Sequence, residues 1–98
     1  MSAAYPWDAD WHGIDDPEQA RGLERELARE LPRDHILAGR TVTALGRRAG
    51  RDDVLFLLDD GTFAQVHLTW NVERNRAWPA TELYPDFAAW LAVPPQDR

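Results

Sequence analysis

The stretch DVLFLLDDGTFAQVHLTW, residues 53–70, carries the strongest structural signal in this chain. Two largely apolar runs flank Asp60-Gly61, a dipeptide typical of the tight turn between antiparallel strands. We therefore predict a hairpin with strands over residues 53–59 and 62–70.

With Asp60 and Gly61 as a two-residue loop, Asp59 faces Thr62, and this register assigns two faces to the hairpin. The face predicted to be apolar and to receive a helix carries Leu55, Leu57, Ala64, Val66, Leu68 and Trp70. The opposite, half-polar face carries Val54, Phe56, Leu58, Phe63, Gln65 and His67. Apolar side chains on this second face need a cover too, so we expect the N-terminal or the C-terminal segment to lie over it.

The flanking segments complete a predicted α+β fold in a single domain, residues 1–98. Residues 40–47 are expected to add a strand, so that residues 40–70 form a three-stranded antiparallel meander. Residues 1–15 have no periodic pattern but hold two tryptophans, and we expect them to form an aromatic arm that docks on the folded body.

Two helices are predicted around the meander. The first covers residues 16–31, where Asp16 can cap the helix, Pro17 suits its first turn and Pro32 ends it. Its apolar stripe consists of Ala20, Leu23, Leu27 and Leu31. The second is a short C-terminal helix over residues 85–92, whose buried side would hold Phe87, Trp90 and Leu91.

Composition limits the classes of partner. The chain has 98 residues with 17 acidic and 11 basic side chains, and its net charge of −6 disfavours nucleic acid and anionic membranes while suiting either solubility or a basic protein partner. It has no cysteine, so neither a disulfide nor a thiolate metal site can form. Because the sequence has no signal-peptide pattern and no apolar run long enough to cross a bilayer, we expect a cytoplasmic protein.

Motifs for common catalytic chemistry are missing. The chain has no Gly-x-Ser-x-Gly elbow and no glycine-rich phosphate loop, and its only serine is Ser2. No cofactor is predicted. We expect a protein that is not an enzyme, although the sequence leaves enzymatic activity open.

Single histidines and carboxylates offer two candidate sites. His67 lies mid-strand and could act as a general acid or base or bind a metal, but a histidine in such a position is more often a hydrogen-bonded structural residue. Asp8, Asp10 and His12 could offer metal ligands from an extended segment, but solvated carboxylates of an arm are far commoner. No second set of ligands supports a metal at either place.

Tryptophan content is the remaining signal. Five tryptophans, at positions 7, 11, 70, 78 and 90, are many for one small core, and tryptophan is enriched in binding hot spots. Alternatively, they form a second core layer over the half-polar face of the sheet. The candidate binding residues are His67, Trp70, Trp78, Glu82 and Tyr84.

The chain resembles a group of small uncharacterised bacterial proteins. The resemblance rests on Gly39-Arg40-x-Val42-x-Ala44, Asp52 to Phe56, Asp60-Gly61, the strand VHLTW at 66–70, and Trp78-Pro79-x-Thr81-Glu82-x-Tyr84. It spans about residues 31–91 and implies no activity or site residue. Such proteins usually carry a Ser-Gly-type turn after the final tryptophan of the strand, where this chain has residues 71–76, NVERNR.

Three functional hypotheses follow. The first is a small non-enzymatic protein-binding or regulatory module, for example an immunity protein for a basic toxin. The second is a small enzyme or small-ligand-binding protein with a pocket around His67, Trp70, Glu82 and Tyr84. The third is a homodimer formed along an edge strand of the meander, either residues 40–47 or 62–70, because a three-stranded sheet has two open edges.

Overall fold

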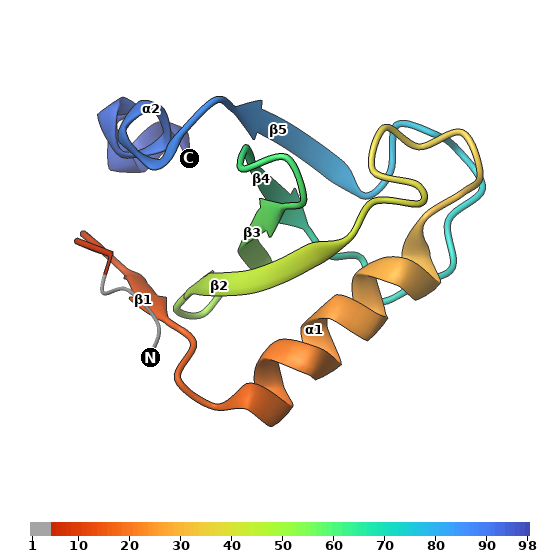
Figure 1. The fold of residues 1–98 in the computed structure, drawn as a ribbon, viewed down its shortest axis with the longest axis horizontal. Coiled ribbons are helices and arrows are strands. Elements are labelled where there is room, and N and C mark those ends of the chain that lie inside the picture. Colours follow the sequence, from red (N-terminus) through yellow and green to blue (C-terminus); the bar gives the residue numbers. More distant parts are fainter. Residues whose placement is uncertain (1–4) are drawn as a thin grey trace.

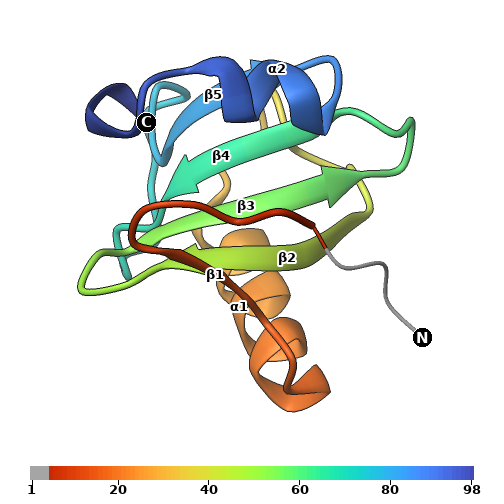
Figure 2. The same ribbon diagram turned by 90° about the vertical axis from the view of Figure 1, so that its left-hand side faces the viewer.

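The computed structural model of this protein describes residues 5–98, which form one antiparallel sheet with helices on both faces (Figure 1). The strands, in spatial order, are β1 Trp11–Gly13, β2 Val42–Arg48, β3 Asp53–Leu58, β4 Phe63–His67 and β5 Ala80–Tyr84. Helix α1, Pro17–Glu30, lies behind the sheet in Figure 2, whereas residues 5–10 cross in front of it and α2, Phe87–Ala92, lies beside β5. A 3-10 turn, Pro95–Asp97, follows α2. The predicted α+β class is confirmed.

The predicted three-stranded meander is wrong in extent, because the sheet has five strands. β1 adds to the outer edge of β2, and β5 adds to the outer edge of β4. β1 has only three residues and β5 is largely exposed, so neither has the apolar alternation that marks a strand in sequence. Both edges proposed for a homodimer therefore already hold a strand of the same chain, although β1 pairs with β2 only at Gly46–Arg48.

The register of the predicted hairpin is wrong by one residue. The loop has three residues, 59–61, and Leu58 faces Thr62 across it, with a hydrogen bond of 2.8 Å from the Leu58 N–H to the Thr62 carbonyl. Gly61 takes the left-handed conformation at φ 85°, and the Asp60 carboxylate accepts hydrogen bonds from the backbone N–H and hydroxyl of Thr62. The extra loop residue turns every side chain of β3 to the opposite face.

The core under α1 therefore contains a different set of β3 residues from the predicted one. The stripe of α1 is confirmed, with Leu23 and Leu27 buried and Ala20 and Leu31 packed against them. Asp16 caps the helix by accepting a hydrogen bond of 2.9 Å from the Glu18 N–H. From the sheet, this core receives Ala44, Val54, Phe56, Leu58, Ala64, Val66 and Leu68.

The second face is covered by an aromatic layer, as the sequence predicted. Its members include Trp11 of β1, Leu55 and Leu57 of β3 and Phe63 of β4. From outside the sheet it receives Tyr5, Trp7, Phe87, Trp90 and Leu91. The fully buried Trp90 donates a hydrogen bond of 2.8 Å from its indole N–H to the Gln65 side chain. Trp7 and Trp11 stack with ring centroids 6.5 Å apart.

The two ends of the described chain meet at this layer. The buried Arg98 guanidinium bonds both carboxylate oxygens of Asp8, at 2.6 and 2.7 Å, and lies 4.2 Å from the centroid of the Trp90 ring. Residues 1–4 of the predicted arm lie outside the described residues. Among residues 5–98, neither helix has the length and apolar character needed to cross a bilayer.

Candidate functional site

Most of the exposed large apolar side chains belong to two loops at one end of the molecule. Loop 31–41 joins α1 to β2 and loop 68–79 joins β4 to β5, and Figure 1 shows the two loops side by side. Within residues 5–98, four of the five exposed large hydrophobic residues lie in them: Ile36, Trp70, Val72 and Trp78, with exposed fractions of 62, 46, 63 and 45%. The fifth is Leu83 of β5. These two loops concentrate the apolar surface that water contacts.

Loop 68–79 is tied to α1 by the buried residue Glu30. Its carboxylate accepts hydrogen bonds from the backbone N–H groups of Thr69 and Trp70, both at 2.8 Å, and from the Thr69 hydroxyl at 3.1 Å. Its backbone carbonyl accepts a further hydrogen bond from the Glu73 N–H at 3.0 Å. A buried carboxylate needs such donors, because without them its desolvation is not compensated. Glu30 therefore fixes the path of the loop at three successive points.

Opposing effects act on the pKa of Glu30. Burial raises this pKa above its usual value, and the neighbouring carboxyl of Glu26 raises it further. The hydrogen bonds from Thr69 and Trp70 act in the opposite direction, but the net shift is upward. The ionised form of this carboxyl is thus disfavoured in the folded protein.

His35 ties the far end of the same loop to loop 31–41. Its Nδ1 atom lies 3.0 Å from the Leu37 N–H and must accept that hydrogen bond, which leaves the proton on Nε2 in the neutral ring. Nε2 then donates to the Pro79 carbonyl at 2.9 Å. With Glu30, this buried side chain holds both loops in place at their bases.

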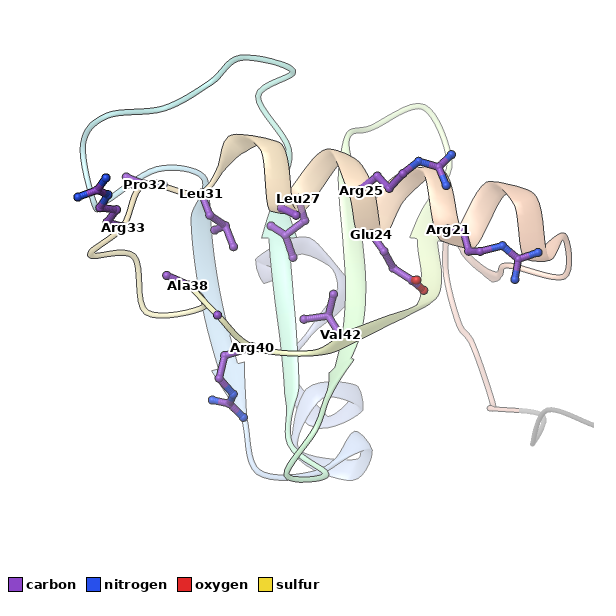
Figure 3. A pocket seen from close by; sticks show the side chains of 12 residues that line it. Arg21, Glu24, Arg25, Leu27, Leu31, Pro32, Arg33, Ala38, Arg40 and Val42 are labelled. Carbon is purple, nitrogen blue, oxygen red and sulfur yellow. The ribbon is translucent and has the colours of Figure 1, made fainter.

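A groove runs along α1 next to loop 31–41 (Figure 3). It has a volume of about 940 Å³ and is open to solvent on one side. The apolar side chains that line it are Leu27, Ala28, Leu31, Pro32, Ala38 and Val42. The charged residues at its margin are Arg21, Glu24, Arg25, Arg33 and Arg40.

The residues predicted to bind a ligand occupy two separate regions. Trp70 and Trp78 belong to loop 68–79, where Trp70 has a φ of 60° and the Trp78-Pro79 peptide bond is cis. His67, Glu82 and Tyr84 lie on β4 and β5, on the sheet face that carries the aromatic layer. None of these five residues lines the groove along α1.

Within the second region, Tyr84 packs against the aromatic layer while Glu82 is exposed. Burial and the charge of Glu82 raise the pKa of the Tyr84 hydroxyl, whereas Arg98 lowers it to a smaller extent. His67 lies diagonally across the ladder from Glu82, since Gln65 faces Glu82 and His67 faces Ala80. This arrangement is an exposed polar strip on the sheet.

His67 pairs with a carboxylate on the neighbouring strand. Its Nδ1 atom lies 2.7 Å from Asp53, and the other carboxylate oxygen of Asp53 lies 3.7 Å from Arg48. About half of the His67 side chain is exposed. A half-exposed histidine held by a carboxylate at Nδ1 has the arrangement of a general base.

The carboxylates considered for a metal site contact arginines. Asp8 bonds Arg98, and Asp10 bonds Arg48 at 2.9 Å. Arg48 holds the pKa of Asp10 below its usual range. No cluster of three or more histidine, aspartate or glutamate side chains suited to a metal ion occurs within residues 5–98.

Several residues that form or fix loops 31–41 and 68–79 were not predicted from sequence. Glu30 and His35 read as ordinary polar residues at a helix end and in a loop, because their partners lie about 40 positions away along the chain. In loop 31–41, Ile36 is exposed, whereas its neighbour Leu37 is fully buried. The only sequence feature that could have pointed to an exposed apolar residue in this loop is the adjacent pair Ile36-Leu37, since one of two consecutive side chains commonly points outward.

Searches against models of protein families, curated proteins and solved structures find no match to this chain.

Proposed function

We propose that this protein is a non-enzymatic protein-binding module whose contact surface is formed by loops 31–41 and 68–79. The observation that carries the proposal is the concentration of Ile36, Trp70, Val72 and Trp78 in two loops that Glu30 and His35 hold in place. Exposed tryptophans on a fixed backbone are typical binding hot spots, because little conformational entropy is lost when a partner covers them.

The local charge of these loops favours a partner with carboxylates. Arg33, Arg74 and Arg76 are exposed and make no ion pair within residues 5–98, whereas the acidic residues of the loops are Asp34 and Glu73. The net charge of −6 alone favours a basic partner, but that charge is spread over the whole molecule. A binding surface is selected by the charges around its apolar anchors, so an acidic partner surface fits this one better.

The test compares affinity capture from the source organism by the tagged protein and by two variants. Trp70→Ala/Trp78→Ala removes both indoles, and Leu83→Ala is the matched control because Leu83 is equally exposed but lies outside the loops. We expect a stoichiometric partner with the wild type and the control, and its loss with the double variant. For the purified partner, removal of a hot-spot tryptophan should weaken Kd about thirtyfold, for a loss of about 2 kcal/mol.

Unchanged capture by the double variant would refute the proposed surface, provided that circular dichroism shows both variants to be folded. A photo-crosslinking amino acid placed at position 70 or at position 83 gives an independent reading. The proposal requires the partner to crosslink at position 70 and not at position 83.

A second candidate function is a small enzyme or ligand-binding protein that uses the strip around His67. It is favoured by the His67–Asp53 pair of 2.7 Å, with Glu82 and Tyr84 on the same sheet face. A fragment screen by NMR distinguishes the candidates. Shifts confined to His67, Glu82 and Tyr84 would favour this alternative, and their absence would leave it without support.

A further inference from the structure

We infer that the groove along α1 binds an acidic, amphipathic helix of the partner protein. This inference rests on the proposed protein-binding function and names the chemistry of the segment that is bound. It is carried by the contrast between the apolar lining of the groove and the arginines that surround it (Figure 3).

The floor of the groove is apolar and continuous with the core. Leu27 is fully buried there, and Leu31 and Val42 are partly buried and pack against the same core cluster. Figure 3 shows the side chains of these three residues pointing into the space between α1 and the segment before β2. An apolar stripe at helical spacing could complete this packing by helix-in-groove binding.

The margin of the groove carries unneutralised positive charge. Arg40 is paired with Asp59 at 2.7 Å, but Arg21, Arg25 and Arg33 make no ion pair within the described part of the chain and are exposed. Three such guanidinium groups around one hollow contrast with the net charge of −6 of the whole protein. Charge complementarity therefore calls for an anionic occupant.

The spacing of the arginines favours a peptide over a small anion. From Arg21 to the end of α1 at Glu30, the helix axis is about 14 Å long at 1.5 Å per residue, and Arg33 lies beyond that end. A ligand with one carboxylate could meet only one end of such a groove. A helix of about three turns with acidic side chains near both ends could meet both.

Binding of a partner strand along the edge of β2 fits the structure less well than binding of a helix in the groove. The Ile14 N–H, just after β1, donates a hydrogen bond of 2.9 Å to the Leu45 carbonyl, so the edge of β2 is open only before Leu45. There the Ala44 N–H already donates a hydrogen bond of 2.9 Å to the Glu24 carboxylate. An added strand would have to break this bond, which protects the sheet edge. A helix lying over Leu31 and Val42 leaves the Glu24–Ala44 bond intact.

The test uses a fluorescent helical peptide of about 14 residues, with leucines at spacings of three and four and glutamates elsewhere. Its matched control has lysine in place of every glutamate. We expect the acidic peptide to bind, the basic peptide not to bind, and NMR shifts to fall on Arg21 to Val42. The variant Arg21→Gln/Arg25→Gln should weaken binding at least tenfold, whereas Arg51→Gln, an exposed arginine outside the groove, should change it less than twofold.

Equal binding of the two peptides, or shifts confined to other surfaces, would overturn the inference. Ala28→Glu, which places a negative charge at the groove on an exposed helical position, gives a second test and should also abolish binding. Laurate distinguishes a lipid ligand, because NMR shifts at the groove with laurate and none with the acidic peptide would refute a peptide site. If the cellular partner is lost with Trp70→Ala/Trp78→Ala but kept with Arg21→Gln/Arg25→Gln, the proposed function stands and the groove inference fails.

Discussion

The buried carboxylate of Glu30 accepts a hydrogen bond of 2.8 Å from the backbone N–H of Trp70, which lies 40 positions further along the chain. Trp70 has a φ of 60°, a left-handed conformation that costs a residue with a side chain about 1–2 kcal/mol. The hydrogen bonds from Thr69 and Trp70 offset this cost. A half-exposed indole is thereby carried on a backbone that α1 holds in place.

Replacing Glu30 by glutamine should loosen the loop. The amide offers one acceptor oxygen where the carboxylate offers two, so either Thr69 or Trp70 would face a buried NH2 group. We expect Glu30→Gln to lower the free energy of unfolding by about 1–3 kcal/mol and to speed hydrogen exchange at the Trp70 amide. Urea unfolding measures the first effect. Glu18→Gln, at an exposed site in the first turn of α1, should cost less than about 1 kcal/mol.

The raised pKa of Glu30 predicts a pH dependence of stability. Between its ordinary value of 4.5 and the higher value in the folded protein, the folded state holds a proton that the unfolded state has released. The contribution of Glu30 to stability is therefore greatest at and below pH 4.5 and declines as the pH rises through this window. Urea unfolding at several pH values should show the wild type losing stability relative to Glu30→Gln above pH 4.5. A constant difference would contradict the shift.

Removing His35 should destabilise the base of the two loops. His35→Leu leaves the Leu37 N–H and the Pro79 carbonyl without their buried partner, at a cost of about 1–3 kcal/mol. His67→Leu is the control, because His67 is half exposed and its pairing with Asp53 is worth at most about 1 kcal/mol. Thermal and urea unfolding of both variants compare the costs. Equal costs would mean that His35 does not hold the loops.

The packing of the Trp7 ring against Gly46 should not tolerate a side chain at position 46. Gly13 and Gly46 face each other across β1 and β2, and a Cβ atom added at Gly46 would overlap the Trp7 ring. We expect Gly46→Ala to cost about 1–3 kcal/mol, since the indole or the strand must move. Gly22→Ala in α1 has open space and should stabilise the protein by about 0.5–1 kcal/mol. Thermal unfolding of both variants checks this contrast.

Part of the candidate site could be predicted from composition and part could not. The tryptophan count pointed to Trp70 and Trp78 as candidate contact residues, and both are half exposed. The predicted hairpin register placed Trp70 on the face beneath a helix, which is wrong, because β4 ends at His67 and the chain then turns toward Glu30. The arginines around the groove belong to α1 and to the loop that follows it, so no local pattern marks them as neighbours.

Three features could be predicted from the sequence alone: the helix from Pro17 with its Asp16 cap and leucine stripe, the hairpin at Asp60-Gly61, and the aromatic cover of the second sheet face. These follow from periodicity, turn residues and capping, which act over a few positions. Three other features are evident only in the tertiary structure: the one-residue shift of β3, the pairing of β1 and β5 with the sheet, and the hydrogen bonds by which Glu30 and His35 hold the two loops. Edge strands and buried polar groups depend on partners that are distant along the chain, and only the folded protein brings those partners within hydrogen-bonding distance.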